Sequence, residues 1–292
     1  MKTSGRSLVL AVKITYIFIL FNLLVACTES NKNPTIRVSF LPDTNKEQID
    51  KRNKPLLQYI TEKTGTQFQI IYADSYTDIY EKFINKEIDL AYFGGYTYVK
   101  AHKTSHAEPL IFRDVDERFH SIVLINNNHP AKKLSDLKNT SFTFGAKLST
   151  SGHLMPRYFF SLSNINPESF FSKLSYSGSH QKTALMVQNN EVTAGVANAE
   201  IIQRMFKDSS LNKQKVRILW TSPPFPDYVW AIQPNVPNKT KNKIREAFLS
   251  LDKNNSEHAK ILKNIGAQYF LSATHENFTV LEDTIKKLNL LK

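Results

Sequence analysis

Two kinds of hydrophobic periodicity alternate along the chain. Segments with apolar residues at every second position, typical of strands, are followed by segments with apolar residues at helical spacing. The first part predicts strands over 36–41, 68–72 and 88–93, and helices over 46–63, over 77–85 and from Tyr96. A second set predicts strands over 120–125, 141–145, 174–176, 193–196 and 216–220, and helices over 133–137, from Ser151 and over 181–188. A strand over 228–232 and helices over 239–251, 258–265 and 282–291 follow. Such alternation is typical of βαβ units with parallel sheets.

The two sets of elements predict two α/β lobes. The sequence contains no internal repeat and no long linker. We expect strands near residues 118–124 and 226–232 to cross between the lobes, so that the last third of the chain returns to the first lobe. The predicted organisation is lobe 1 over 35–118 and 233–292, and lobe 2 over 119–232.

The first residues have the pattern of a bacterial lipoprotein signal. Basic residues precede an apolar run from Ile14 to Ala26, whose thirteen residues contain no acid. As a helix this run reaches only about 20 Å, short of a hydrocarbon core of about 30 Å, so it indicates a secretory signal rather than a spanning helix. It ends in Leu24-Val25-Ala26-Cys27, the spacing of a lipobox. We therefore predict a signal peptide over 1–26, lipidation at Cys27 and a polar tether over 27–34.

Composition excludes some function classes. The chain has 292 residues, a net charge of +12 and a single cysteine, which excludes an intramolecular disulfide and a multi-cysteine metal cluster. Without the three basic residues of the signal, the net charge falls to +9. The lysines are interspersed with acids, and their densest cluster, over 239–245, accompanies no nucleic-acid-binding module. The excess charge therefore predicts a solvated face that favours anions, not a nucleic-acid partner.

Motifs for catalysis are weak. The sequence has no Walker loop, no dinucleotide fingerprint and no HExxH helix, and we expect no cofactor. His102 and His106 have i, i+4 spacing but no third ligand nearby, so a solvated helix face is the better interpretation than a metal site. Ser151, His180 and Asp227 could form a triad, yet Ser151 lacks the nucleophile-elbow context. We expect no enzymatic activity.

A run of hydroxyl residues has the pattern of an anion site. Ser149, Thr150 and Ser151 join a predicted strand end to a predicted helix start. Side-chain hydroxyls beside unpaired backbone N–H groups, at the positive end of a helix dipole, suit a tetrahedral oxyanion. One hydroxyl residue suffices for N-capping, so three in succession favour binding.

This run and four other stretches resemble the phosphate/phosphite/phosphonate-binding proteins of ABC importers (PhnD-like). The five stretches are 149–158, 72–76, 89–94, 177–185 and 226–230, and together they span most of the chain after the signal. The resemblance implies the type II periplasmic-binding-protein fold, with two α/β lobes joined by a two-strand hinge and the ligand cleft between them.

The resemblance also implies roles for single residues. Ser149, Thr150 and Ser151 would hold the phosphonate oxygens, Tyr76 would donate its phenol and His180 an imidazole N–H or a charge. In the aminoethylphosphonate-binding branch two carboxylates neutralise the ligand ammonium, and Glu200 and Asp227 occupy those positions. Alternatives stay open: His180 could be a satisfied histidine at a helix start, Asp227 could orient the hinge strand, and Glu200 could simply favour a helix N-terminus.

One position departs from that branch, which has a tyrosine where this chain has Phe93. Phe93 offers ring contact without the hydroxyl, and the adjacent Tyr92 should point to the opposite face of the strand. Gly94, followed by Gly95, leaves room for backbone approach at the strand end.

We therefore expect a lipid-anchored receptor, monomeric and on the periplasmic or extracytoplasmic face of the cell envelope. It would capture a phosphonate, phosphite or phosphate-like anion and deliver it to an ABC permease and its ATPase, with the lipid as its only membrane contact. Two alternatives are a sensory receptor of the same fold that acts with a histidine kinase, and a secreted hydrolase that uses Ser151 and His180. The sequence leaves open which phosphorus oxyanion is the ligand, and whether Glu200 and Asp227 bind an amine.

Overall fold

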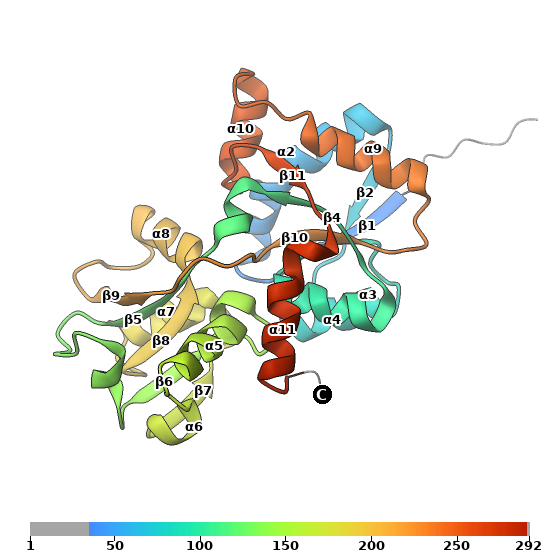
Figure 1. The fold of residues 1–292 in the computed structure, drawn as a ribbon. Coiled ribbons are helices and arrows are strands. Elements are labelled where there is room, and N and C mark those ends of the chain that lie inside the picture. The colour runs from blue at the N-terminus through green and yellow to red at the C-terminus, as the bar shows by residue number, and fades with distance from the viewer. Residues whose placement is uncertain (1–34, 291–292) are drawn as a thin grey trace, which may run out of the picture. The chain divides into compact units, whose positions relative to one another are not determined.

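The computed structural model describes residues 35–290. The predicted signal peptide, the cysteine that is predicted to be lipidated and the predicted tether lie outside these residues. Within the described part of the chain, no helix is both long enough and apolar enough to cross a membrane. The described residues form two α/β lobes, each built on its own sheet, as the fold-class prediction requires (Figure 1).

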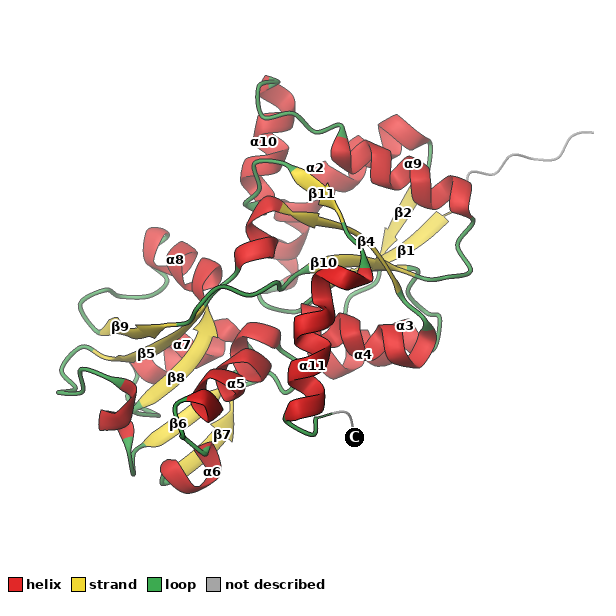
Figure 2. Cartoon of the chain, in the orientation of Figure 1, coloured by secondary structure: helices red, strands yellow, loops and turns green. Residues whose placement is uncertain are grey.

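The first sheet has six strands in the order β11-β4-β10-β3-β1-β2. Figure 2 shows its strands in yellow with helices on both sides. Its strands are β1 (Thr35–Phe40), β2 (Gln67–Ile70), β3 (Leu90–Phe93), β4 (Glu108–Arg113), β10 (Val229–Ile232) and β11 (Phe270–Ser272). Helices cover both of its faces, which completes a three-layer lobe. They are α2 (Lys46–Thr64), α3 (Tyr76–Ile84), α4 (Gly95–Ser105), α9 (Asn238–Leu249), α10 (Ser256–Ile265) and α11 (Thr279–Lys287).

The second sheet has five strands in the order β7-β6-β8-β5-β9. Its strands are β5 (Ser121–Asn126), β6 (Ser141–Phe144), β7 (Lys173–Tyr176), β8 (Ala194–Asn198) and β9 (Val216–Thr221). The helices of this lobe are α5 (Met155–Leu162), α6 (Pro167–Phe170), α7 (His180–Gln188) and α8 (Ala199–Lys207). Short helical turns, η1 (Asp114–Arg118), η2 (Leu134–Leu137), η3 (Thr150–Leu154) and η4 (His275–Phe278), complete the elements.

The expectation of parallel sheets holds only in part, because both sheets are mixed. In the first sheet β1 pairs in parallel with β2 and β3, but β10 runs antiparallel to β3 and β4, and β11 runs antiparallel to β4. In the second sheet β5 is antiparallel to β8 and β9. The physical reason is that a segment which crosses between the lobes enters the new sheet without a covering helix, so the handedness rule for βαβ units does not constrain its direction.

The core of each lobe lies on both faces of its sheet. In the first lobe, side chains of α2, α9 and α10 form one buried cluster and those of α3, α4 and α11 form another. Neighbouring rings of β3 show the alternation: Phe93 packs edge-on against Phe83 in one cluster, whereas Tyr92 contacts Trp230 on the other face. The opposite orientation that alternation predicts for Tyr92 is therefore found.

Two segments cross between the sheets, and they are hydrogen-bonded to each other. One joins β4 to β5 and the other joins β9 to β10 (Figure 1). Phe119 and Phe225 exchange both backbone N–H···O bonds, at 2.8 and 3.0 Å, and the Asp227 N–H donates to the Asp116 carbonyl at 2.9 Å. The crossing is thus a short two-stranded ribbon. The residues at which one lobe passes into the other, 118–119 and 232–233, stay a prediction.

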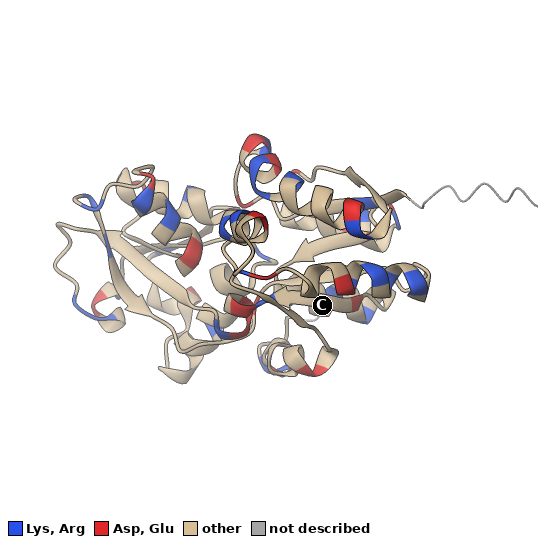
Figure 3. Ribbon diagram, turned by 90° about the horizontal axis from the view of Figure 1, so that it is seen from above, with Lys and Arg blue, Asp and Glu red and all other residues tan. Residues whose placement is uncertain are grey.

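Charged residues are distributed over most elements of both lobes (Figure 3). Lys241, which belongs to the densest basic cluster of the sequence, is buried and pairs with Glu108 at 2.7 Å. Part of the basic excess therefore serves local structure.

A glycine at the centre of the second sheet provides a test of its packing. A Cβ added to Gly195 in β8 would lie 2.7 Å from Thr183 Cγ2 and 2.9 Å from Thr143 Cγ2. We expect Gly195→Ala to lower the free energy of unfolding, measured in urea, by about 1–3 kcal/mol because such overpacking forces neighbours to shift.

The matched control combines Thr143→Ser with Thr183→Ser, which removes both methyl groups. In that background Gly195→Ala should cost less, since contacting residues couple. An equal cost in both backgrounds would show that these contacts do not set the penalty.

Candidate functional site

The polar residues of the site follow strands whose carboxyl ends lie together. In the first lobe Asp43, Ser75–Tyr76 and Gly94 follow β1, β2 and β3, which are mutually parallel. In the second lobe Ser149, His180 and the end of β8 are connected in the same way to the parallel strands β6, β7 and β8. The carboxyl ends of parallel strands are where ligands bind in open α/β sheets.

The hydroxyl run forms the first turn of a helix. Ser149 is its N-cap, and its Oγ accepts the Gly152 N–H at 2.9 Å, as the capping chemistry predicts. The turn over Thr150–Leu154 is π-helical and continues into α5, so the helix begins where the sequence predicted. All three hydroxyl residues are buried.

Thr150 and Asp227 hold the N-terminus of α4. The Thr150 Oγ1 accepts the Tyr96 N–H at 3.0 Å, and the Asp227 Oδ1 accepts the Gly95 N–H at 3.2 Å. Their oxygens approach so closely that a Cβ at Gly94 would lie 3.1 Å from Thr150 Oγ1 and 3.3 Å from Asp227 Oδ1. Gly94 thus permits the close backbone approach that the sequence predicted.

The buried oxygens of this region are not all paired. Within the part of the chain that the structure describes, Ser151 Oγ and Asp227 Oδ2 have no hydrogen-bond partner within 3.5 Å, although the Ser151 hydroxyl lies near enough to Asp227 to lower its pKa. An unpaired buried polar group costs about 1–3 kcal/mol, so both atoms are available to a polar group that would enter the site. Burial raises the pKa of Asp227 to about 7, although the hydroxyls of Thr150 and Ser151 act in the opposite direction. Near neutral pH this carboxyl group can therefore donate a proton or accept one.

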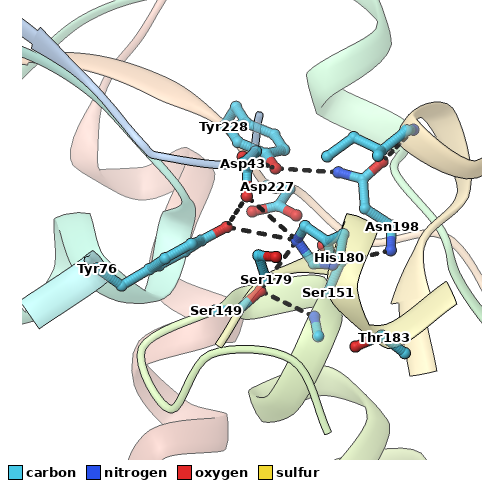
Figure 4. A network of polar contacts seen from close by, with 12 residues as sticks. Asp43, Tyr76, Ser149, Ser151, Ser179, His180, Thr183, Asn198, Asp227 and Tyr228 are labelled. Carbon is cyan, nitrogen blue, oxygen red and sulfur yellow. Dashed lines mark hydrogen bonds and ion pairs between the residues drawn. The ribbon is translucent and has the colours of Figure 1, made fainter. Parts of the chain in front are cut away.

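Asp43 is the centre of a second set of contacts (Figure 4). Its carboxylate accepts the Tyr76 hydroxyl at 2.5 Å and the Tyr228 hydroxyl at 3.0 Å. The Tyr228 oxygen also accepts the side-chain amide of Asn198 at 3.0 Å. Burial, together with the Asp43 charge, raises the pKa of both tyrosines well above their ordinary value, so both are donors at neutral pH.

His180 is held in one tautomer. The backbone N–H of Asn198 donates to Nδ1 at 3.1 Å, so Nδ1 must accept and the proton of the neutral ring lies on Nε2. Burial lowers the pKa of His180, which favours this neutral form. Nε2 lies 3.4 Å from both Ser149 Oγ and Tyr76 Oη and 3.8 Å from Asp43 Oδ1. The imidazole N–H is therefore directed at the hydroxyls.

The structure brings together most of the residues that the sequence singled out, but not all. Polar atoms of Tyr76, Ser149, Thr150, Ser151, His180 and Asp227 lie close together, next to Gly94. Phe93 is fully buried in the core against Phe83 and adds no polar group. Glu200 lines a cavity with Arg52 and Arg204, whose wall also includes Asp43, Asn198 and Tyr228 but not Asp227.

Sequence reasoning missed Asp43, Asn198 and Tyr228. Tyr228 lies inside one of the quoted motifs, and Asn198 lies two residues beyond the predicted strand over 193–196, at the end of β8. Asp43 had a weaker signal, a single acid in the loop after the first strand, although the rule for the carboxyl ends of parallel strands points to that loop.

The hypothetical catalytic triad does not match the observed contacts. In a triad the histidine Nδ1–H donates to the acid, but His180 Nδ1 accepts the Asn198 N–H. The Asp227 carboxylate instead accepts the Gly95 N–H.

His102, one of the two histidines with i, i+4 spacing, is engaged in local contacts. Its Nδ1 contacts the Ala107 carbonyl at 2.8 Å, and its ring stacks on His275.

Comparison with known proteins identifies the class to which this fold and site belong. The family described as ABC transporter, phosphonate, periplasmic substrate-binding protein matches residues 38–278. The chain therefore belongs to this family, which confirms the predicted resemblance.

Individual relatives agree. A probable phosphite-binding protein of an ABC transporter from Prochlorococcus marinus, PhnD1, is 29% identical over 274 residues, which covers 89% of this chain and 92% of the relative. The phosphonates-binding periplasmic protein of Escherichia coli is 23% identical over 270 residues, 90% of this chain and 79% of the relative. The structure of PhnD1 with methylphosphonate superimposes with a TM-score of 0.82 at 27% identity, over 87% of this chain and 98% of that one.

The predicted solute-binding function is confirmed at this level. The chain is an extracytoplasmic solute-binding component of an ABC transport system, and the sensory alternative is not favoured. Its relatives are transporter binding proteins, not enzymes.

The raised pKa of Asp227 generates a test of the site. The folded protein holds the proton of the Asp227 carboxyl group more tightly than the unfolded chain does, so protonation stabilises the folded state. This contribution to the free energy of unfolding is fully present below about pH 4. It is lost as the pH rises to about 7, at roughly 1.4 kcal/mol per pH unit. Asp227→Asn cannot ionise. We expect its stability relative to the wild type to increase across that window, measured by urea unfolding of the ligand-free protein.

Asp283→Asn changes an exposed carboxylate and is the control for the general effect of removing one negative charge. If the difference between Asp227→Asn and the wild type is constant from pH 4 to 8, Asp227 does not have a raised pKa.

Proposed function

We propose that the chain captures a small phosphorus oxyanion of the phosphonate type at the carboxyl ends of its parallel strands. Ser149, Thr150 and Ser151 hold the oxyanion, together with the Nε2–H of His180 and the phenol of Tyr76, whose proton would turn from Asp43 to the ligand. The single observation that carries this proposal is the buried, unpaired hydroxyl of Ser151 beside a set of donors contributed by both lobes. Hydrogen bonds to an ionised group are roughly twice as strong as neutral ones, so such an anion gains from each donor.

The proposed donors come from both lobes. Tyr76 begins a helix after β2, and Ser149 and His180 follow strands of the second sheet. A ligand held by both sets of donors would link the lobes and stabilise their closed arrangement, which is how binding free energy is converted into a domain movement. The lobes in this proposal are residues 35–118 with 233–292 and residues 119–232.

No bond is made or broken in the proposed function. The histidine is oriented by a backbone N–H and not by a carboxylate, so it lacks the arrangement that makes it a general base for Ser149 or Ser151. The bound anion is instead passed to the permease of the transporter, whose ATPase drives uptake. We propose that the protein acts as a monomer, and that the lipid on Cys27 is its only attachment to the membrane.

Ser151→Ala is the sharpest test of the oxyanion site. Since the Ser151 Oγ has no partner among the described residues, its removal should leave the unfolding free energy unchanged or slightly higher. Loss of one hydrogen bond to an anion costs about 1.5–3 kcal/mol, so methylphosphonate should bind roughly 10- to 100-fold more weakly by calorimetry. The double variant Ser149→Ala with Thr150→Ala should abolish binding.

Ser161→Ala provides a matched control on α5, where the serine is exposed. It should bind methylphosphonate as the wild type does. Equal affinities of Ser151→Ala, the double variant and the wild type would refute the assignment of the oxyanion site.

The proposed anchor has its own test. In a bacterial host fed with an alkyne-tagged fatty acid, the wild-type chain should be labelled and should sediment with membranes. Cys27→Ser should be unlabelled and should remain in the soluble fraction of the envelope, because it lacks the only thiol of the chain. A labelled Cys27→Ser protein, or an unlabelled wild type, would exclude lipidation at this residue.

A further inference from the structure

A cavity of about 50 Å³ lies beside the proposed oxyanion site. Asp43, Asn198 and Tyr228 form part of its wall, and Arg52, Glu200 and Arg204 form another part. A single water requires roughly 10–15 Å³ of such space, so the cavity can accept a small group of several atoms. An adjoining hollow of about 270 Å³ shares Arg52 and Arg204 with it and extends past the exposed Lys51.

Two arginines from different lobes face this cavity without partners. Arg52 belongs to α2 and Arg204 to α8. Both are half-buried, yet neither guanidinium has a hydrogen bond or an ion pair to any residue between 35 and 290. Burial lowers the pKa of both, that of Arg204 to about 10, and other arginines nearby contribute to the shift. The charges of Asp43 and Glu200, which line the same cavity, act in the opposite direction on Arg52 and Arg204, but neither carboxylate is hydrogen-bonded to them.

A third arginine, Arg113, lines the same cavity and, unlike the other two, has hydrogen-bond acceptors among the described residues. The guanidinium of Arg113 binds both oxygens of Asp116, at 2.9 and 2.6 Å, and the Ile265 carbonyl at 2.5 Å. Each of the three nitrogens of Arg113 thereby has a hydrogen-bond acceptor. Arg52 and Arg204 carry the same guanidinium group, but no carboxylate among residues 35–290 is hydrogen-bonded to it.

One side chain, that of Asp43, adjoins both this cavity and the proposed oxyanion donors. Asp43 lines the cavity, and its Oδ1 also accepts the Tyr76 hydroxyl and lies 3.8 Å from His180 Nε2. A substituent that projects from a phosphorus atom bound at His180 and Ser149 reaches the arginines by passing Asp43.

We propose that this cavity is a subsite for a carboxylate-bearing substituent of the phosphonate, held between Arg52 and Arg204. The inference rests on the proposed function, because it places the phosphorus end of the ligand at the hydroxyl run. Guanidinium groups match a carboxylate in a planar, bidentate geometry. One arginine comes from each lobe, so the carboxylate would also relieve the repulsion between like charges that closing the lobes brings together. Glu200, on the same wall, is in place for an ammonium group on such a substituent.

The test compares two ligands that differ in the carboxylate. Affinities of methylphosphonate and 3-phosphonopropionate are measured by calorimetry on the full chain after Cys27, for the wild type, Arg52→Gln and Arg204→Gln. We expect the wild type to bind 3-phosphonopropionate at least 10-fold more tightly than methylphosphonate. Each arginine variant should reduce that ratio to near one while its affinity for methylphosphonate changes by less than about 2-fold, which also shows that it folds. Lys54→Gln, on the exposed side of α2, is the control and should retain the wild-type ratio.

The outcomes separate the two proposals. If methylphosphonate binds but 3-phosphonopropionate gains nothing, or if the gain survives in both arginine variants, the carboxylate subsite is wrong and the proposed function stands. If neither ligand binds, both proposals fail. Tighter binding of 2-aminoethylphosphonate than of 3-phosphonopropionate would assign the cavity to an ammonium and overturn the inference. Strengthening of methylphosphonate binding by added acetate, lost in Arg52→Gln, would show that a free anion and not a substituent occupies the cavity.

Discussion

The buried carboxylate of Asp43 is the group around which the two lobes are organised. A carboxylate removed from water needs hydrogen-bond donors, and Asp43 obtains them from Tyr76, in the first lobe, and from Tyr228, which follows the crossing ribbon. Tyr228 in turn accepts from Asn198 at the end of a strand of the second sheet. This chain of bonds brings the carboxyl ends of both sets of parallel strands to one place, and the proposed oxyanion donors lie directly beside it.

The electrostatics of the site differ from what the net charge of the chain suggests. Nearest the proposed anion are neutral donors, namely hydroxyls, a neutral imidazole and the N-terminal turn of a helix. Full positive charges lie further away, on Arg52 and Arg204 beyond Asp43. Neutral donors bind an anion without the desolvation cost of a buried cation, whereas the arginines act on whatever is attached to it. Recognition of the phosphorus group and recognition of its substituent are thus assigned to separate sets of residues.

Much of this arrangement could be predicted from the sequence, and the failures have physical causes. The hydroxyl run was identifiable because three side chains of one chemistry are contiguous. The strands β4 and β11 were missed, because β4 contains a proline and β11 has only three residues. The antiparallel pairings were missed since periodicity does not encode strand direction. Asp43 was missed because a single loop acid has no pattern, and the separation of Glu200 from Asp227 depends on tertiary geometry alone.

The ribbon that joins the lobes is held by main-chain hydrogen bonds, at Phe119 with Phe225 and at Asp227 with Asp116. Backbone groups are the same in every residue, so these hydrogen bonds do not depend on side-chain identity, whereas the buried rings of Phe119, Phe225 and Tyr228 pack around them. Mutations can therefore accumulate over both lobes while the axis that relates them is retained. This gives a physical reason why a chain only 27% identical to PhnD1 superimposes on it with a TM-score of 0.82. In such an architecture the residues that select the substrate can change while the ribbon about which the lobes move is retained.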